Sequence, residues 1–338
     1  MSTIHFLNVY EGDCNIIQHD TGRITVIDVS NADDHVDTPA EKALKATEAR
    51  KAMRERNYVP SDKRNYGQKH IPDNPIDYLK KLKIGNIFRF IVTHPDMDHL
   101  DGIKDLFNSF RINCVWDTDN KKPDLSTGGG YNEEDWQFYK GIRDQTNKAY
   151  TRLTYTSKNS CNFFDLDDIH ILAPTAGLVK QAIEADDYND SSYVLLYTPP
   201  KKGGGTWKIL FAGDSHDKTW EYILNDQELK GLVTNIDVLF APHHGRDSQR
   251  KYDFLNTLNP KVTLMGNAGS EHLAYSSYRG IRITNNEAGY VVINITSDAL
   301  VFYVKNEEFA INFAHKREWQ RPVKDLNYDA FPIVQFNP

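Results

Sequence analysis

Cysteine is scarce in this chain, and long apolar runs are absent. The three cysteines, Cys14, Cys114 and Cys161, are scattered through 338 residues with no CxxC spacing, which predicts neither a disulfide framework nor a thiolate zinc site. No stretch approaches the roughly 18 consecutive apolar residues that a membrane helix needs, and the N-terminus has no basic and apolar leader pattern. We therefore expect a cytoplasmic protein without membrane association, in which any metal is bound by histidine and carboxylate side chains.

The composition is that of an ordered acidic protein. Hydrophobic residues make up 39% of the chain, charged residues 26% and aromatic residues 12%, which excludes disordered and collagen-like chains. The 47 acidic residues outnumber the 40 Lys and Arg residues, so the net charge is −7. This balance argues against a whole surface built for nucleic acid, although a local basic patch is compatible with it.

Strand and helix patterns predict a mixed α/β fold. Three short strands with tight turns open the chain as an antiparallel meander, at residues 4–9, 14–19 and 23–29. A helix from Pro75, a buried strand at 86–93 and a helix at 103–110 follow as an α/β unit. Further strands are predicted at 169–174, 191–198, 207–213, 236–242, 261–266, 289–295 and 299–305. So many strands with few helices favour a mixed sandwich.

Two polar insertions interrupt the predicted domain, which spans residues 1–305. The first, at 31–73, is basic, because residues 41–70 contain nine Lys or Arg residues but only four acidic residues. An exposed, solvated helix explains this composition, and an arm that contacts phosphates is the alternative, with the arginines Arg50, Arg54 and Arg56. The second insertion covers 117–165 and contains a predicted helix at 133–146. The aromatic C-terminal extension, 306–338, is predicted to be irregular and to pack onto the body.

Four potential metal ligands follow the buried strand at 86–93. His94, Asp96, Asp98 and His99 lie within six residues. Two carboxylates this close raise each other's pKa, whereas a bound divalent cation keeps both ionised. The segment therefore predicts a metal site, and a surface turn is the alternative when the segment is taken alone.

Two later strands end in matching groups. Asp214 follows the apolar run at 207–213, and His243 and His244 follow the run at 236–242. Polar groups that converge from the ends of several core strands are typical of a metal-hydrolase site.

These segments resemble the metallo-β-lactamase fold superfamily. Its string THxHxDHxxG appears as THPDMDHLDG at residues 93–102, with Asp96 in place of a histidine. The segments FLNVYEGDCNIIQ, VIDVS, YNDSSYVLLY, LFAGD and APHHG look like the ComEC-type branch of bacterial DNA-uptake proteins. The resemblance covers residues 4–30 and 74–305. It implies a four-layer αββα sandwich with mixed sheets. In that branch the domain normally accompanies a membrane channel, and because this sequence has no long apolar runs, a stand-alone form is implied.

The resemblance also implies two divalent metal ions. The implied ligands are His94 and Asp96 for the first ion and Asp98, His99 and His243 for the second, with Asp214 bridging both. Asn189 and Asp190 stand where the superfamily has a further histidine and are expected to support the ligands. Oxygen donors then lead over imidazoles, so we favour Mn²⁺ over Zn²⁺, with Mg²⁺ as a third candidate.

Two such ions can activate a water and polarise a phosphoryl oxygen, which makes Asp98, Asp214 and His244 the predicted catalytic residues. His244 would protonate the leaving group or contact the phosphate, or it would exchange roles with the ligand His243. Asp28 is expected to orient a ligand. The candidate substrate contacts, besides the three arginines of the first insertion, are Arg246 and His272.

We therefore predict a metal-dependent phosphodiester hydrolase, and within that class a nuclease that acts on DNA rather than RNA. One alternative is a metallohydrolase of a small substrate such as a cyclic nucleotide, lactone or thioester, because a fold does not fix its substrate. The other is an inactive scaffold whose C-terminal extension docks a protein partner or a second copy of the chain.

Overall fold

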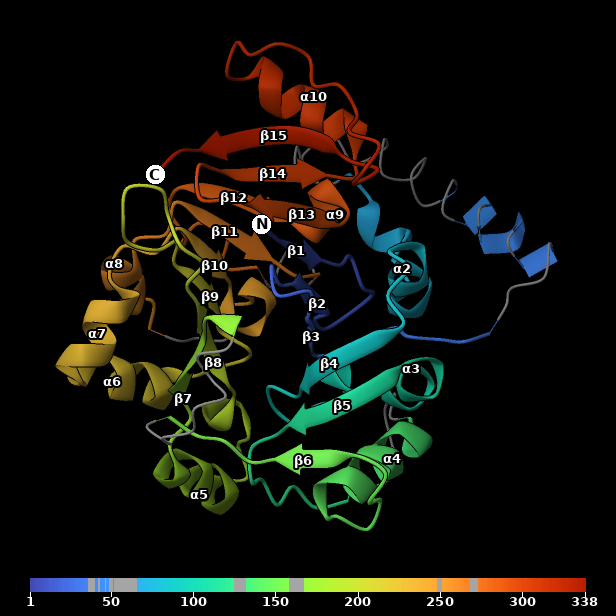
Figure 1. Ribbon diagram of the computed structural model, residues 1–338, viewed down its shortest axis with the longest axis vertical. Coiled ribbons are helices and arrows are strands. Elements are labelled where there is room, and N and C mark those ends of the chain that lie inside the picture. The colour runs from blue at the N-terminus through green and yellow to red at the C-terminus, as the bar shows by residue number, and fades with distance from the viewer. Residues whose placement is uncertain are drawn as a thin grey trace.

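Two mixed β-sheets packed face to face form the centre of the molecule (Figure 1). The computed structural model describes residues 1–35, 40–41, 43–45, 47–48, 51, 66–124, 132–157, 167–247, 251–267 and 273–338. The larger sheet has the strand order β15-β14-β13-β1-β2-β3-β4-β5-β6, and the smaller sheet has the order β12-β11-β10-β9-β8-β7.

The larger sheet joins both ends of the chain. Its strands are β1 (Ser2–Phe6), β2 (Asn15–Gln18), β3 (Ile24–Ile27), β4 (Asn86–Ile91), β5 (Arg111–Trp116), β6 (Thr151–Leu153), β13 (Val291–Ile295), β14 (Leu300–Val304) and β15 (Phe331–Phe336). The pairs from β15 to β3 are antiparallel, whereas β3, β4, β5 and β6 run parallel.

The smaller sheet is also mixed. Its strands are β7 (Ile169–Ala173), β8 (Val194–Tyr197), β9 (Ile209–Phe211), β10 (Val238–Phe240), β11 (Val262–Met265) and β12 (Ile281–Thr284). Strands β9 to β12 run parallel, and β7, β8 and β9 pair antiparallel. Each sheet therefore has a parallel block whose strand ends share one edge.

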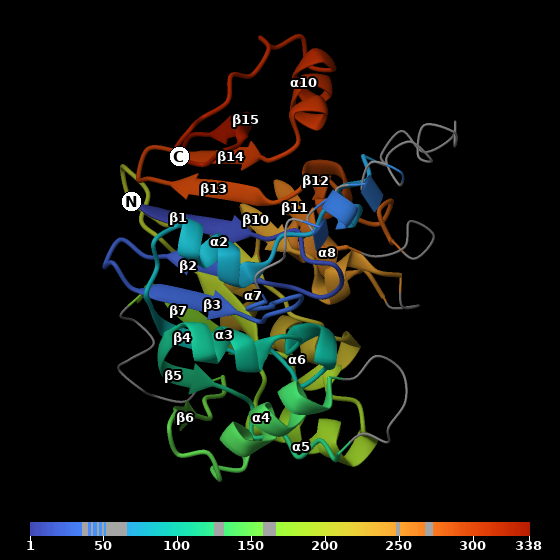
Figure 2. The same ribbon diagram turned by 90° about the vertical axis from the view of Figure 1, so that its right-hand side faces the viewer.

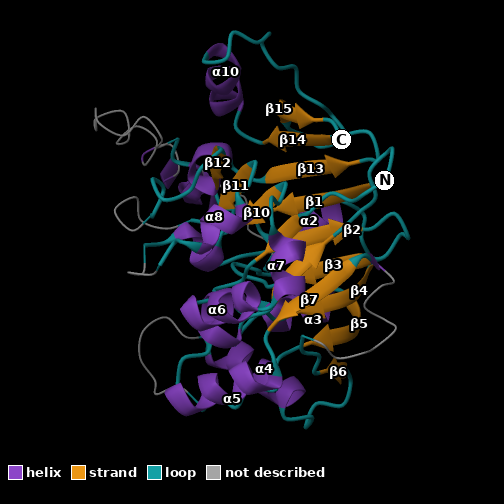
Figure 3. Ribbon diagram, turned by 90° about the vertical axis from the view of Figure 1, so that its left-hand side faces the viewer, coloured by secondary structure: helices purple, strands orange, loops and turns teal. Residues whose placement is uncertain are grey.

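Helices flank both sheets (Figures 1 and 3). They are α2 (Pro75–Lys81), α3 (Ile103–Ser109), α4 (Glu133–Arg143), α5 (Ala176–Ala185), α6 (Asp217–Asn225), α7 (Gln227–Val233), α8 (Phe254–Leu258), α9 (Asn285–Ala288) and α10 (Glu307–His315). Helices α9 and α10 pack against the apolar cluster between the sheets, and most of the others cover the outer faces. Short 3₁₀ turns occur at η1 (Gln68–His70), η2 (Met97–His99), η4 (Asn189–Ser191) and η5 (Pro242–Gly245). Side-chain caps fix the N-termini of several helices. In α2, the side chain of the N-cap residue Asn74 accepts a hydrogen bond from the Ile76 amide, and Pro75 occupies the first helical position.

Three apolar clusters define the layers. One lies between the sheets and includes Phe6 and Ile27 of the larger sheet with Phe211 and Phe240 of the smaller. The second joins the outer face of the larger sheet to α2, α3 and α4, and the third joins the smaller sheet to α6, α7 and α8. The predicted four-layer αββα sandwich with mixed sheets is therefore confirmed.

The N-terminal meander and the α/β unit from Pro75 to residue 110 are present as predicted. The prediction of an irregular C-terminal extension is wrong: it contains α10 and the strand β15, which pairs with β14 at the edge of the larger sheet (Figure 2). The aromatic residues that made the segment look irregular pack in the core, among them Phe309, Phe313 and Phe331.

Much of the basic insertion lies outside the described residues, including Arg50, Arg54 and Arg56. Within the second insertion, α4 forms as predicted, and β6 adds to the edge of the larger sheet. The domain and insertion boundaries remain predictions. No helix in the described part of the chain is long and apolar enough to cross a membrane.

Two histidines buried in the larger sheet are expected to make stability depend on pH. Burial lowers the pKa of both His5 and His19 from 6.5 to about 4, although hydrogen bonding to Gln18 opposes the shift at His5 and the charge of Asp167 opposes it at His19. Because the unfolded chain then binds protons at higher pH than the folded chain, stability falls as the pH drops from 6.5 towards 4.

Urea unfolding at pH 7 and pH 5 measures this effect. We expect His5→Gln to reduce the difference in free energy of unfolding between the two pH values by about 2 kcal/mol, whereas His35→Gln, at an exposed position, leaves it unchanged. An identical pH dependence in His5→Gln and the original chain would contradict the assignment.

Candidate metal centre

The predicted metal ligands meet where the parallel strands of the two sheets end. His94 follows β4, and Asp98 and His99 lie in η2 just beyond it; Asp214 follows β9. Parallel strands end at a common edge, so the two sheets bring these groups face to face across the sandwich. The Tyr193 amide donates to the carbonyl of Thr93 over 3.0 Å and ties the sheets together beside the site.

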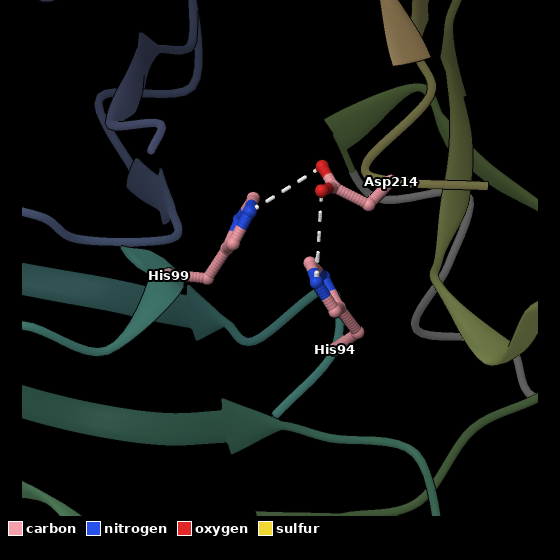
Figure 4. A group of neighbouring side chains, drawn as sticks. All are labelled: His94, His99 and Asp214. Atoms are coloured by element: carbon pink, nitrogen blue, oxygen red, sulfur yellow. Dashed lines mark ion pairs between the residues drawn. The ribbon is translucent and has the colours of Figure 1, made fainter. Parts of the chain in front are cut away.

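Two histidines of the larger sheet converge on one carboxylate of the smaller (Figure 4). His99 Nε2 lies 3.3 Å from Asp214 Oδ1, and His94 Nε2 lies 3.9 Å from Asp214 Oδ2. All three side chains are buried, and each places a ligand atom within 4.8 Å of the others. Ligand atoms that share one cation at bonds of about 2 Å lie roughly 3–4 Å apart, so these spacings suit a metal ion.

Asp98 and His244 extend the cluster on the His99 side. His244 Nε2 lies 3.3 Å from Asp98 Oδ2 and 3.7 Å from Asp214 Oδ2, and Asp98 Oδ2 lies 3.8 Å from His99 Nε2. Asp98, His99 and His244 form a second group whose ligand atoms all lie within 4.8 Å of one another. Asp214 contacts both groups, as expected for a bridging carboxylate.

Asp96 faces the first group and a lysine. Its Oδ2 lies 3.7 Å from His94 Nε2, and its Oδ1 accepts a 2.5 Å hydrogen bond from Lys122 Nζ. Lys122 is buried and belongs to the second polar insertion. The sequence pattern does not single out this lysine, because polar residues surround it there.

Polar contacts on the far side of each ring orient the three buried histidines: a hydrogen bond for His94 and for His99, and an ion pair for His244. Asp28 Oδ2 lies 2.8 Å from His99 Nδ1, and the Thr93 hydroxyl lies 3.1 Å from His94 Nδ1. Asp13 Oδ1 lies 3.2 Å from His244 Nδ1. With the proton on Nδ1, each Nε2 lone pair points into the centre, which is the tautomer a metal ligand needs.

Asp28 holds this arrangement through several contacts. It accepts hydrogen bonds from the Thr93 amide over 2.7 Å and from the Thr93 hydroxyl over 2.6 Å, besides its contact with His99. Asp13 was not identified from the sequence, because the turn before β2 looks like an ordinary polar turn.

The electrostatics of the cluster couple the carboxylates to the imidazoles. Burial lowers the pKa of His99, but the carboxylates of Asp214, Asp28 and Asp98 outweigh it and hold the pKa well above the usual value. Burial raises the pKa of Asp214, but the charges of His244, His99 and His94 outweigh it and hold the pKa well below the usual range. The buried carboxylates therefore require positive charge, which protons or divalent cations can supply.

The donor set fits divalent cations. His94 Nε2, His99 Nε2 and Asp214 Oδ1 are buried and make no hydrogen bond among the described residues. Buried polar atoms that lack such partners are costly unless something else binds them. Three imidazole nitrogens and several carboxylate oxygens pointing inward are a ligand set for Zn²⁺ or Mn²⁺.

The backbone is constrained on both sides of the centre. Gly12 has φ of +81°, and a Cβ there would lie within 1.6 Å of the carbonyl oxygen of Asp98. His243 and His244 both adopt positive φ, at 53° and 56°. Left-handed conformations are uncommon for such residues and cluster at functional sites.

The left-handed turn sends the two adjacent histidines to different places. His244 is buried beside Asp98, whereas the side chain of His243 is 21% exposed, lies 3.7 Å from Asp214 Oδ2 and stacks on the ring of His216. The geometry therefore favours the exchanged assignment, in which His244 rather than His243 joins Asp98 and His99.

The other predicted residues lie in different surroundings. Asn189 and Asp190 lie in η4 beside His216, rather than against His94. Arg246 is exposed one residue after η5. His272 lies outside the described residues, as do the three arginines of the basic insertion.

No protein-family model and no curated protein sequence matches the chain. Similar solved structures include Igni18, a metallo hydrolase from the archaeon Ignicoccus hospitalis, at 13% identity and a TM-score of 0.41, covering 87% of this chain and 100% of that one. The metallo-β-lactamase fold protein YhfI from Bacillus subtilis is 9% identical with a TM-score of 0.39, covering 86% and 100%. A long form RNase Z from yeast is 11% identical with a TM-score of 0.36, covering 86% and 41%.

Asp28 and Asp13 contact the Nδ1 atoms of His99 and His244 and are expected to control metal affinity. Asp28→Asn and Asp13→Asn should each weaken Mn²⁺ or Zn²⁺ binding about 10- to 100-fold in calorimetric titration, because the imidazoles lose their orientation. Asp101→Asn is the matched control, since Asp101 accepts from the Asn31 amide and contacts no histidine of the centre. Equal affinities in all three variants would contradict this role.

Proposed function

We propose that the chain is a metal-dependent hydrolase of phosphodiesters. The observation that carries this proposal is the convergence of His94, His99 and Asp214 with inward-facing Nε2 and carboxylate atoms, joined by Asp98 and His244. No serine or cysteine nucleophile is needed, and Cys14 is unsuited to that role because it is buried and burial raises the pKa of its thiol.

The residues divide between two cation positions. His94, Asp96 and Asp214 would hold one ion, and Asp98, His99 and His244 would hold the other, with Asp214 between them. When bound, such ions supply Lewis acidity and make water a nucleophile near neutral pH. The protein's own contribution is orientation: Asp28, Thr93 and Asp13 fix the imidazoles, and Lys122 fixes Asp96.

Hydrogen-bond donors beside the centre support an anionic substrate. Lys122 contacts Asp96 from the larger-sheet side, and His243 and His216 form a partly exposed stacked pair on the other side. A phosphodiester carries one negative charge and offers oxygens to such donors. His243 takes the role of phosphate contact that the sequence assigned to His244.

Within this class, DNA is the proposed substrate, in line with the ComEC-type resemblance of the sequence. Arg50, Arg54, Arg56, Arg246 and His272 remain proposed contacts to the nucleic acid. A metallohydrolase of a small anionic substrate is the second candidate, and the net charge of −7 favours it, because an acidic protein repels a polyanion.

Metal-dependent cleavage assays test the proposal. We expect hydrolysis of bis(p-nitrophenyl)phosphate with added Mn²⁺, and a loss of about 100- to 1,000-fold in kcat in Asp98→Asn and Asp214→Asn, because charge stabilisation at the reacting centre is removed. Asp101→Asn should keep its activity.

Nicking of supercoiled plasmid by the same proteins separates the two substrates. Nicking that disappears in Asp214→Asn indicates the nuclease, and turnover of the small ester without nicking indicates the second candidate. An unaltered rate in Asp98→Asn and Asp214→Asn, or no turnover of either substrate with Mn²⁺ or Zn²⁺, would overturn the proposed function.

A further inference from the structure

A separate group of metal-ligating side chains lies beside the candidate metal centre. Asp187, Asp190 and His216 each place one ligand atom within 4.8 Å of the other two. Asp187 follows α5, Asp190 lies in η4, and His216 is the residue that caps α6. The loop before β8 and the loop after β9 thus supply ligands to the same place.

Asp190 is the buried member of this group. Its exposed fraction is 5%, and its Oδ1 is buried without a hydrogen-bond partner among the described residues. The ammonium of Lys218 lies 3.8 Å from the other oxygen, Oδ2, beyond hydrogen-bonding distance. A buried carboxylate oxygen without a partner is costly, so this atom indicates a ligand that the described side chains do not provide.

An ion pair within the group does not account for that oxygen. His216 Nδ1 lies 3.5 Å from Asp187 Oδ2, and His216 Nε2 lies 3.1 Å from the side-chain amide of Asn189. These contacts use both nitrogens of His216 and leave Asp190 Oδ1 unsatisfied. A cation that replaces the proton on His216 Nδ1 would be shared by the imidazole and both carboxylates.

We propose that Asp187, Asp190 and His216 bind a further divalent transition-metal cation, separate from the candidate metal centre. One imidazole and two carboxylates suit Mn²⁺, Fe²⁺ or Zn²⁺, whereas Ca²⁺ and Mg²⁺ prefer oxygen ligands alone. This inference goes beyond the proposed function and does not require it.

The position of this site gives it a consequence for the neighbouring centre. The ring of His216 stacks on that of His243, with centroids 5.8 Å apart and planes inclined by 25°, and His243 Nε2 lies 3.7 Å from Asp214. A cation bound to His216 would fix the orientation of its ring against His243 and add positive charge beside these two histidines.

An exposed acidic group elsewhere in the fold provides a contrast. Asp33, Asp34 and Asp105 also place ligand atoms within 4.8 Å of one another. Two of these residues are exposed and none is an imidazole, so solvent can satisfy their oxygens. We assign no cation to this group, and it serves as the matched control.

Metal analysis of the full chain tests the inference. After equilibration with Mn²⁺ and removal of excess metal, elemental analysis should show about one equivalent less per chain in Asp187→Asn, Asp190→Asn and His216→Gln than in the original protein. Asp33→Asn should retain the full content. The Asp187 side chain is 42% exposed, so the fold is expected to tolerate its substitution.

The variant Asp214→Asn separates this site from the candidate metal centre. Combining it with Asp187→Asn should remove about one further equivalent of metal relative to Asp214→Asn alone, whether or not the centre is catalytic. Unchanged metal content in Asp187→Asn, Asp190→Asn and His216→Gln would overturn the inference. So would no further loss in the double variant, because the residues would then only support the centre.

Discussion

The buried carboxylate of Asp28 is the contact on which the metal centre depends. It lies after β3, receives the amide and hydroxyl of Thr93 after β4, and holds the ring of His99 through Nδ1. One side chain thereby fixes the relative position of two parallel strand ends and the direction of an imidazole. Asp13 repeats the device on His244 from the turn before β2, so carboxylates from the meander orient ligands that belong to both sheets.

The sandwich architecture explains why the ligands come from distant parts of the chain. Each sheet contributes a parallel block, and the ends of β4 and β9 face each other across the apolar layer between the sheets. Apolar strands supply the rigidity, and the loops at their ends carry the polar groups. Gly12 allows the first turn to approach the backbone of Asp98, which places the meander directly against the centre.

Much of this arrangement is predictable from the sequence, because each ligand segment follows an apolar strand pattern. His94, Asp98, His99 and Asp214 are recognisable in this way. The division of labour between His243 and His244 is not, since it depends on two successive residues with positive φ. Lys122 and Asp13 could not be predicted either, because polar residues surround each of them and no motif marks either one. Strand β15 was missed because Pro332 and aromatic residues obscure its alternation.

Anomalous diffraction from crystals grown with Mn²⁺ tests the central claim most directly. We expect one anomalous peak among His94, Asp96 and Asp214 and a second among Asp98, His99 and His244. Absence of any peak among these side chains, with Mn²⁺ bound elsewhere on the molecule, would contradict it.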